Sequence, residues 1–270
     1  MCAEGRGRQP NPLLLQAEVR SVRGLTEDLF LLDMTGFPNE FDPAPGTFLH
    51  LKVSQEDHPL LRRPISIQSY VDGVVTLLIR EVGAGTRILH HLRPRDLIDA
   101  LGPLGRGFSP IGRGDRVLMV GGGVGVAPLV AACHAAQLDS EIDFCYGGKN
   151  IGEIQDLSAF EDRKERIRFR ISTDDGSLGY HGFCTDLASQ LVREKDFTRV
   201  LTCGPWIMMR KVAAMAREAS LPLEVSLEVQ MGCGLGACLS CVYRSTDGEF
   251  IRSCIDGPVV DGHTVCWDEE

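Results

Sequence analysis

The sequence predicts a small antiparallel β-barrel of six strands, a doubly wound α/β domain with a parallel sheet, and a cysteine-rich C-terminal segment. Residues 13–105 contain six short apolar or β-branched runs separated by Gly, Pro, Asn or Asp, which is typical of a small barrel. Between residues 116 and 219, apolar strands alternate with helical stretches, which favours a parallel sheet covered by helices. Four of the ten cysteines lie between Cys233 and Cys254.

Composition and charge exclude several classes of protein. With 43% apolar and 24% charged residues in a chain of 270, the sequence is neither disordered, collagen-like nor a coiled coil. A net charge of -9 makes non-specific nucleic-acid binding a poor hypothesis, because that binding depends on Lys and Arg neutralising phosphates. We expect neither a secretory signal nor a transmembrane helix, since no apolar run is long enough. We therefore expect a cytoplasmic protein whose cysteines serve metal or redox chemistry rather than disulfides.

The boundaries of the parts follow from these patterns. We predict a flexible tail at residues 1–10, the barrel at 11–109, the α/β domain at 110–222 and the cysteine-rich segment at 223–270, with a linker near 109–114. The predicted barrel strands are 13–22, 28–34, 46–53, 64–70, 74–82 and 96–105, with a short helix at 86–92. In the α/β domain we predict strands at 116–123, 141–148, 166–172 and 199–205, and helices at 126–138, 185–194 and 206–219.

The cysteine-rich segment has the spacing C-x4-C-x2-C-x12-C, formed by Cys233, Cys238, Cys241 and Cys254. Three cysteines at this spacing followed by a distant fourth are typical of a plant-type [2Fe–2S] centre. A structural zinc site is the alternative, although such sites favour two C-x2–4-C pairs and only one C-x2-C is present here. Cys266 is an alternative fourth ligand; we prefer Cys254, which is nearer the loop and follows an apparent strand.

Glycines between a strand and a helix form a second candidate site. Gly121, Gly122, Gly123 and Gly125 stand where a nucleotide pyrophosphate meets a helix N-terminus, although a tight structural turn is the alternative. The run Cys203-Gly204-Pro205 ends a later strand, so we expect it at the same edge of the sheet, with a buried structural Cys203 as the alternative. Asp174 and Asp175 follow another strand, where they would bond a ribose hydroxyl or simply form a polar turn.

A third candidate site lies on the predicted barrel. In the run Arg62-Arg63-Pro64-Ile65-Ser66-Ile67, an Arg and a Ser at this spacing could hold a phosphate and a flavin ring, or the arginines could simply be exposed. Downstream, Leu78-Ile79-Arg80 precedes Gly85 and Thr86, whose backbone and hydroxyl donors could bind a second phosphate group.

Acid–base or nucleophilic chemistry is not indicated by this sequence. The seven histidines are scattered, and we interpret the adjacent pair His90 and His91 as solvated helix surface. We find no arrangement typical of a Ser-His-Asp or Cys-His nucleophile, and no pair of catalytic carboxylates. We therefore predict no catalytic residue in this chain.

Taken together, these motifs resemble a known family. The R-P-x-S strand, the Gly-Thr turn, GGGxGxAP and CGP resemble the ferredoxin-NADP reductase superfamily. The segment LEVQMGCGLGACLSCV, followed by SCIDGPVVDG, is similar to that of the electron-transfer subunits of bacterial class 1B dihydroorotate dehydrogenases, and the resemblance covers about residues 12–267. It implies a barrel that binds FAD, an α/β domain that binds NAD, and a segment that binds [2Fe–2S].

The resemblance also implies roles for particular residues. The centre would be ligated by Cys233, Cys238, Cys241 and Cys254. FAD would be held by Arg63, Pro64, Ile65, Ser66, Leu78, Ile79, Arg80, Gly85 and Thr86, and NAD by Gly121, Gly122, Gly123, Gly125, Cys203, Gly204 and Pro205.

In such a family, dihydroorotate is oxidised on a separate subunit that contains FMN, and electrons pass through [2Fe–2S] and FAD to NAD+. The resemblance implies a heterotetramer with two copies of each subunit. A same-cofactor subunit serving sulfite reductase or a ferredoxin/NADPH oxidoreductase is the alternative. The ferredoxin enzymes tend to carry Asp at the first cysteine position, so Cys233 favours the dihydroorotate hypothesis. A zinc-stabilised nucleotide-binding protein is a further alternative. Lys149 would suit the 2′-phosphate of NADP, whereas the family suggests NAD.

Overall fold

The computed structural model describes residues 12–54 and 58–268, so the predicted tail at 1–10 lies outside the described residues. The chain divides into two compact units. The barrel unit contains residues up to 109 together with 228–243 and 250–259, and the sheet unit contains residues 110–227 together with 244–249 and 260–270. The boundary between the two units after Ser109 falls at the predicted linker.

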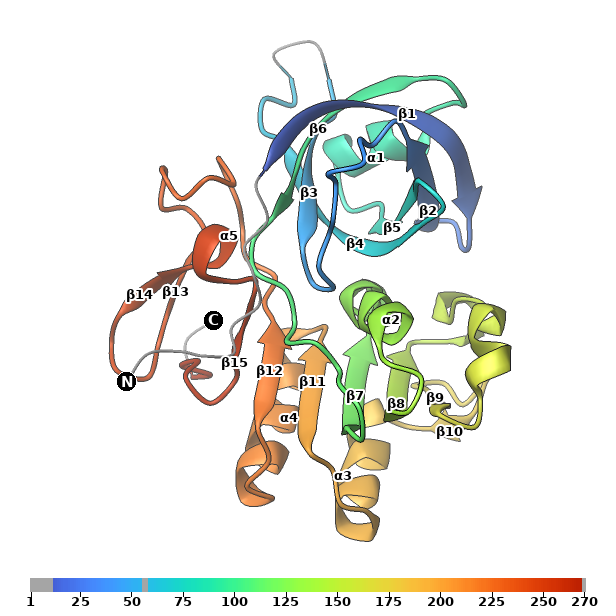
Figure 1. Ribbon diagram of the computed structural model, residues 1–270, viewed down its shortest axis with the longest axis vertical. Helices are drawn as coiled ribbons and strands as arrows, with labels where there is room; N and C mark the ends of the chain where they lie inside the picture. Colours follow the sequence, from blue (N-terminus) through green and yellow to red (C-terminus); the bar gives the residue numbers. More distant parts are fainter. Residues whose placement is uncertain (1–11, 55–57, 269–270) are drawn as a thin grey trace. The chain divides into compact units, whose positions relative to one another are not determined.

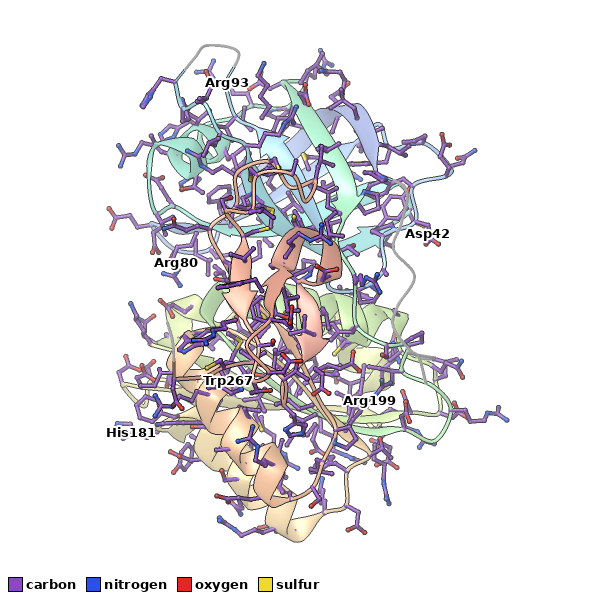
Figure 2. The ribbon with its side chains drawn as sticks, turned by 90° about the vertical axis from the view of Figure 1, so that its left-hand side faces the viewer. Asp42, Arg80, Arg93, His181, Arg199 and Trp267 are labelled. Carbon is purple, nitrogen blue, oxygen red and sulfur yellow. The ribbon has the colours of Figure 1, made fainter. Side chains whose placement is uncertain are left out.

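The C-terminal segment is shared between these two units, whereas the sequence predicts one separate part at 223–270. Apolar side chains next to the cysteines pack against barrel residues, which assigns 228–243 and 250–259 to the barrel unit. The last residues belong to the sheet unit and include Trp267, which Figure 2 labels. Its ring lies against that of Trp206, with ring centroids 4.8 Å apart. The division follows from contacts between segments far apart in the sequence.

The six predicted strands of the barrel are confirmed (Figure 1). They close in the order β1-β2-β5-β4-β3-β6, and every neighbouring pair is antiparallel. The bounds are β1 Leu13–Gly24, β2 Leu29–Thr35, β3 Phe48–Lys52, β4 Arg63–Val71, β5 Val74–Arg80 and β6 Leu97–Leu104, and the short helix α1 is Ala84–His90.

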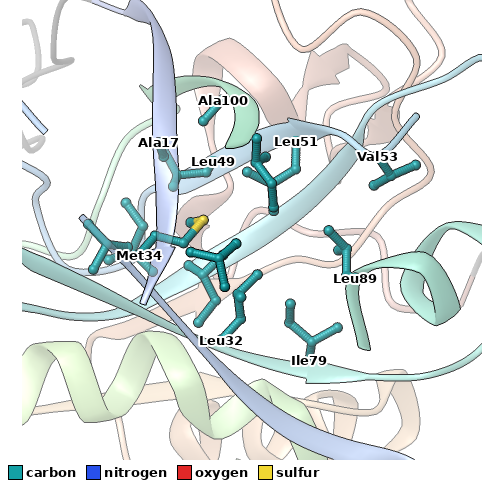
Figure 3. Close-up of a cluster of buried hydrophobic side chains, with 14 of the residues drawn as sticks. Ala17, Leu32, Met34, Leu49, Leu51, Val53, Ile79, Leu89 and Ala100 are labelled. Atoms are coloured by element: carbon teal, nitrogen blue, oxygen red, sulfur yellow. The ribbon is translucent and has the colours of Figure 1, made fainter. Parts of the chain in front are cut away.

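Apolar side chains from all six strands fill the barrel (Figure 3). Leu32, Leu49, Leu51 and Ala100 are fully buried there, and Leu89 of α1 closes the core. Alternating residues of a strand point to opposite faces, so one set of side chains enters the core and the next remains at the surface. This pattern explains why the strand prediction from apolar spacing succeeded.

The sheet unit has seven strands in the order β10-β9-β8-β7-β11-β12-β15, and the pairs from β10 to β12 are parallel. Strand order reverses between β7 and β11, which is the switch point at which open parallel sheets bind ligands. The strands are β7 Arg116–Gly122, β8 Glu141–Gly148, β9 Ile167–Thr173, β10 Tyr180–His181, β11 Arg199–Cys203, β12 Leu223–Ser226 and β15 Val259–Asp261.

Helices α2 Val126–Ala135, α3 Cys184–Glu194 and α4 Trp206–Glu218 agree with the predicted ranges, and the doubly wound interpretation is confirmed. Because parallel crossovers are right-handed, the reversal of strand order places α2 on one face of the sheet and α3 and α4 on the other. The strand expected just before Cys254 is β14 Phe250–Arg252. The sequence did not predict η2 Ile151–Glu153, η3 Ser158–Arg163, β10, β12, β15, β13 Val242–Arg244 or α5 Ser253–Asp256. Among the described residues, no helix has the length and apolarity needed to span a membrane.

Candidate functional site

The four cysteines of the predicted centre lie together in the barrel unit. Cys233 and Cys238 are in the irregular stretch before β13, Cys241 immediately precedes that strand, and Cys254 is in α5. Gly234 and Gly236 have φ of +72° and +77°, a conformation that other residues rarely adopt. The two glycines let the chain fold tightly around its own cysteines.

Backbone amides of this loop point toward the sulfurs. The amide of Gly236 donates to Cys254 Sγ at 3.2 Å, that of Leu235 to Cys233 Sγ at 3.4 Å, and that of Cys233 to Cys238 Sγ at 3.4 Å. Such N–H to sulfur bonds surround Fe–S centres and set their potential. The donor set and the inward amides fit a [2Fe–2S] centre.

The thiol environments differ strongly. Hydrogen bonding with the Ser240 hydroxyl, at 3.3 Å, and with backbone amides lowers the pKa of the exposed Cys238 thiol to about 6. Burial raises the pKa of the Cys254 thiol to about 12, and its interaction with Cys241 acts in the same direction. The sequence analysis overlooked Ser240, although its place inside the C-x2-C pair is a usable signal.

The loop is attached to the barrel through apolar contacts. Cys241 and Cys254 share a buried cluster with Phe48 of β3 and Leu104 of β6. Cys266, the alternative fourth ligand, belongs to the sheet unit, where its amide donates to the Arg244 carbonyl at 3.1 Å. Within the described part of the chain, no three His, Cys, Asp or Glu side chains are grouped as ligands of a single ion.

Two of the FAD candidates of the barrel, Arg63 and Gly85, lie against each other. A Cβ atom at this glycine would lie 2.3 Å from Nε of Arg63, so the guanidinium of β4 lies directly over the start of α1. Arg63 also donates to the carbonyl of Leu61. A guanidinium beside a helix N-terminus is a suitable environment for a phosphate group.

The other FAD candidates have more specific roles than the sequence suggested. The Thr86 hydroxyl accepts from the amides of Val82 and Gly83, at 2.9 and 3.2 Å, so it already serves the loop. Leu78 and Ile79 are buried in β5, where they pair with Leu31 and Phe30 of β2. Arg80 forms an ion pair with Asp28 at 2.6 Å. Pro64, Ile65 and Ser66 lie half-buried on β4.

The NAD candidates come together in the sheet unit. A Cβ atom at Gly125 would lie 2.5 Å from Cα of Gly204, so the two turns are in backbone contact. Gly204 itself, with φ of +150°, has the Gly122 backbone within 3.0 Å of its missing side chain. Gly123 adopts φ of +56° in the turn η1 Gly123–Gly125, and Pro205 caps α4. Gly121 packs against Leu129 and Val126 of α2.

Cys203 and the two aspartates differ in what they offer to a ligand. The Cys203 side chain is buried, and its residue pairs with Gly121 across β11 and β7. Asp174 and Asp175 lie at the same sheet edge, because their amides donate to Gly148 and Lys149 carbonyls at 3.0 and 3.2 Å. The Asp175 carboxylate accepts from the Ser177 amide within the turn, so Asp174 is the aspartate left for a ribose.

The prediction that His90 and His91 are both solvated helix surface is wrong for His90. The His90 ring stacks on Phe30 with centroids 4.2 Å apart, and its Nδ1 lies 3.0 Å from Glu81 Oε2. His91 is exposed as expected. His50, which the sequence analysis did not single out, is fully buried in β3.

Comparison with known proteins gives the chain a family. Residues 228–266 match the model of the iron-sulfur cluster binding domain of dihydroorotate dehydrogenase B, and residues 119–214 match the oxidoreductase NAD-binding domain. A dihydroorotate dehydrogenase B (NAD(+)) electron transfer subunit from Desulforamulus reducens is 40% identical over 231 residues, covering 83% of this chain and 87% of its own. This chain belongs to the dihydroorotate dehydrogenase B electron transfer subunits.

Solved structures share the fold of this chain. The structure reported for an NADH-dependent reduced ferredoxin-NADP oxidoreductase superposes with a TM-score of 0.80 at 29% identity, covering 94% of this chain and 90% of that one. A ferredoxin NADP+ reductase from Neisseria gonorrhoeae with bound FAD and NADP has a TM-score of 0.61 at 15% identity, and covers 76% of this chain and 91% of its own. That second likeness shows the fold alone.

Proposed function

We propose that this chain takes electrons from the FMN of a dihydroorotate dehydrogenase catalytic subunit and delivers them to NAD+, as part of UMP synthesis. One observation carries the proposal. A loop that carries three of the four cysteines donates backbone amides to the sulfurs of Cys233, Cys238 and Cys254, in the same unit as the FAD candidates. This loop lies within the matched cluster-binding region.

Each part of the chain has a defined task in this proposal. Cys233, Cys238, Cys241 and Cys254 hold the [2Fe–2S] centre, and the loop amides stabilise its negative charge. Arg63, with the loop at Gly85, holds a phosphate of FAD. When bound, the centre transfers single electrons and FAD joins them into the pair that NAD+ accepts.

The turns at Gly125 and Gly204 hold the pyrophosphate of the nicotinamide nucleotide in the sheet unit. Their backbones touch, which places the two turns side by side. Asp174 supports NAD rather than NADP, because a carboxylate accepts from ribose hydroxyls and repels a 2′-phosphate. The cytoplasmic location stays a prediction from the sequence.

The proposal assigns dihydroorotate oxidation to the partner. The residues that meet at the three sites here are cysteines, glycines and an arginine, whose chemistry suits electron transfer and phosphate binding rather than proton abstraction. The assembly that we propose contains two copies of each subunit.

The test is dihydroorotate-dependent NAD+ reduction by this protein mixed with the FMN-containing catalytic subunit of the same organism. Flavin and iron contents are measured first. We expect rapid NADH formation that requires both proteins. Absence of coupling, from a protein that holds FAD and [2Fe–2S], would contradict this partner and favour another electron donor or acceptor.

A further inference from the structure

His50 is a buried imidazole in the barrel unit. It lies in the middle of β3, where its residue pairs with Pro64 of β4 and with Leu101 of β6. Its exposed fraction is 0%, and among the described residues neither Nδ1 nor Nε2 has a hydrogen-bond partner of normal geometry. Buried polar groups nearly always have partners, so an imidazole with two unpaired nitrogens requires an explanation.

The imidazole faces the cysteine loop. A Cβ atom at Gly234 would lie 2.7 Å from His50 Nδ1 and 3.3 Å from Cε1. The ring therefore lies against bare backbone beside Cys233, with no side chain between them. The neighbouring amide of Leu235 already donates to Cys233 Sγ at 3.4 Å.

Arg62 fixes the strand that carries His50. Its guanidinium donates to the His50 carbonyl at 3.1 Å and pairs with Asp99 at 2.7 Å. An imidazole has at least one N–H donor to offer in either protonation state.

We propose that His50 is a positioning residue that donates a hydrogen bond from Nδ1 toward the iron–sulfur centre beside Cys233. The inference rests on the proposed function, since it requires that the four cysteines hold such a centre. An N–H directed at a sulfur stabilises the added negative charge of the reduced centre and raises its potential. An apolar residue would fill the same space without burying two polar atoms. His50 also sits on the strand paired with β4, which carries the flavin candidates.

The experiment is a redox titration of the purified protein, followed by EPR of the reduced centre. We expect H50L, which removes the donor, to shift the potential of the centre to lower values. H50N, whose amide nitrogen lies near the position of Nδ1, should have a potential close to that of the wild type. H50Q, whose amide nitrogen mimics Nε2, should show the lowered potential of H50L. H134L, which removes an exposed histidine of the sheet unit, is the control and should leave the potential unchanged.

A measurement on the wild-type protein tests the role of His50 even if the variants lose the iron–sulfur centre. In protein labelled with 15N-histidine, pulsed EPR should detect a histidine nitrogen coupled to the reduced centre, and the coupling should disappear in H50N. An unchanged potential in H50L, or no such coupling in labelled wild type, would overturn the role of His50. A wild-type protein that contains no [2Fe–2S] centre would instead overturn the proposed function.

Discussion

At the scale of single residues, the four cysteines are unequal before any metal is bound. Cys238 is exposed and its pKa is about 6, so much of it is thiolate near neutral pH. Cys254 is fully buried with a pKa of about 12, so it holds its proton until iron displaces it. Together they give the loop one ready nucleophilic ligand and one ligand protected within the core.

These environments predict different outcomes for three serine variants. C238S and C254S should each lose the visible absorption and EPR signal of the [2Fe–2S] centre, because one thiolate ligand is missing. Both should keep FAD, since the flavin candidates lie elsewhere on the barrel. C266S is the matched control and should keep the full signal. A normal spectrum for C238S, or loss of the centre in C266S, would show that the ligand assignment is wrong.

At the scale of secondary-structure elements, glycines decide how closely the turns approach their neighbours. Gly85 gives room to the Arg63 guanidinium of β4, and Gly125 gives room to the Gly204 backbone. The two contacts differ in character. An arginine side chain can swing away from an added methyl group, whereas backbone facing backbone cannot move without separating the two turns. Gly85 is therefore the better position for a binding test, because the protein should still fold when Gly85 is replaced by alanine.

We expect G85A to fold and to bind FAD about 10-fold more weakly, equivalent to roughly 1.4 kcal/mol. The added Cβ displaces Arg63 from the phosphate position. The measurement is the dissociation constant of FAD, followed by flavin fluorescence in apoprotein. G83A is the matched control, because a Cβ there meets no atom within 4 Å. Equal affinities for wild type and G85A would contradict the placement of the phosphate at Arg63.

At the scale of the whole molecule, cofactor candidates are divided between the two units. The cysteines and the flavin candidates belong to the barrel unit, and the nucleotide turns belong to the sheet unit. The step between one-electron and two-electron carriers is therefore assigned to a single compact unit.

This division predicts the behaviour of the isolated chain. Loaded with FAD and [2Fe–2S], it should oxidise NADH with an artificial electron acceptor, at a rate that does not depend on the catalytic partner. It should not oxidise dihydroorotate, since that chemistry needs the partner's FMN site. The check is an NADH-dependent dye assay beside a dihydroorotate assay on the same preparation. Dihydroorotate turnover by the isolated chain would contradict the division of labour.

Sequence by itself determined the fold class and the chemical identity of the sites. Strand alternation and strand–helix alternation are local patterns, so all six barrel strands and the main α/β elements were predictable. Cysteine spacing and glycine turns are also local, and they were sufficient to indicate [2Fe–2S] and nucleotide binding. Such signals survive because a few neighbouring residues must satisfy a fixed geometry.

Only the tertiary structure decided which segments meet. The pairing of His50 with Gly234, and of Gly125 with Gly204, joins residues from distant parts of the chain. The sharing of the C-terminal segment between the two units is of the same kind. No local pattern encodes such contacts, because they depend on the packing of whole elements around a common core. His50 shows this most clearly. Within its strand it is an ordinary buried residue, and only the folded structure places its imidazole against the cysteine loop at Gly234.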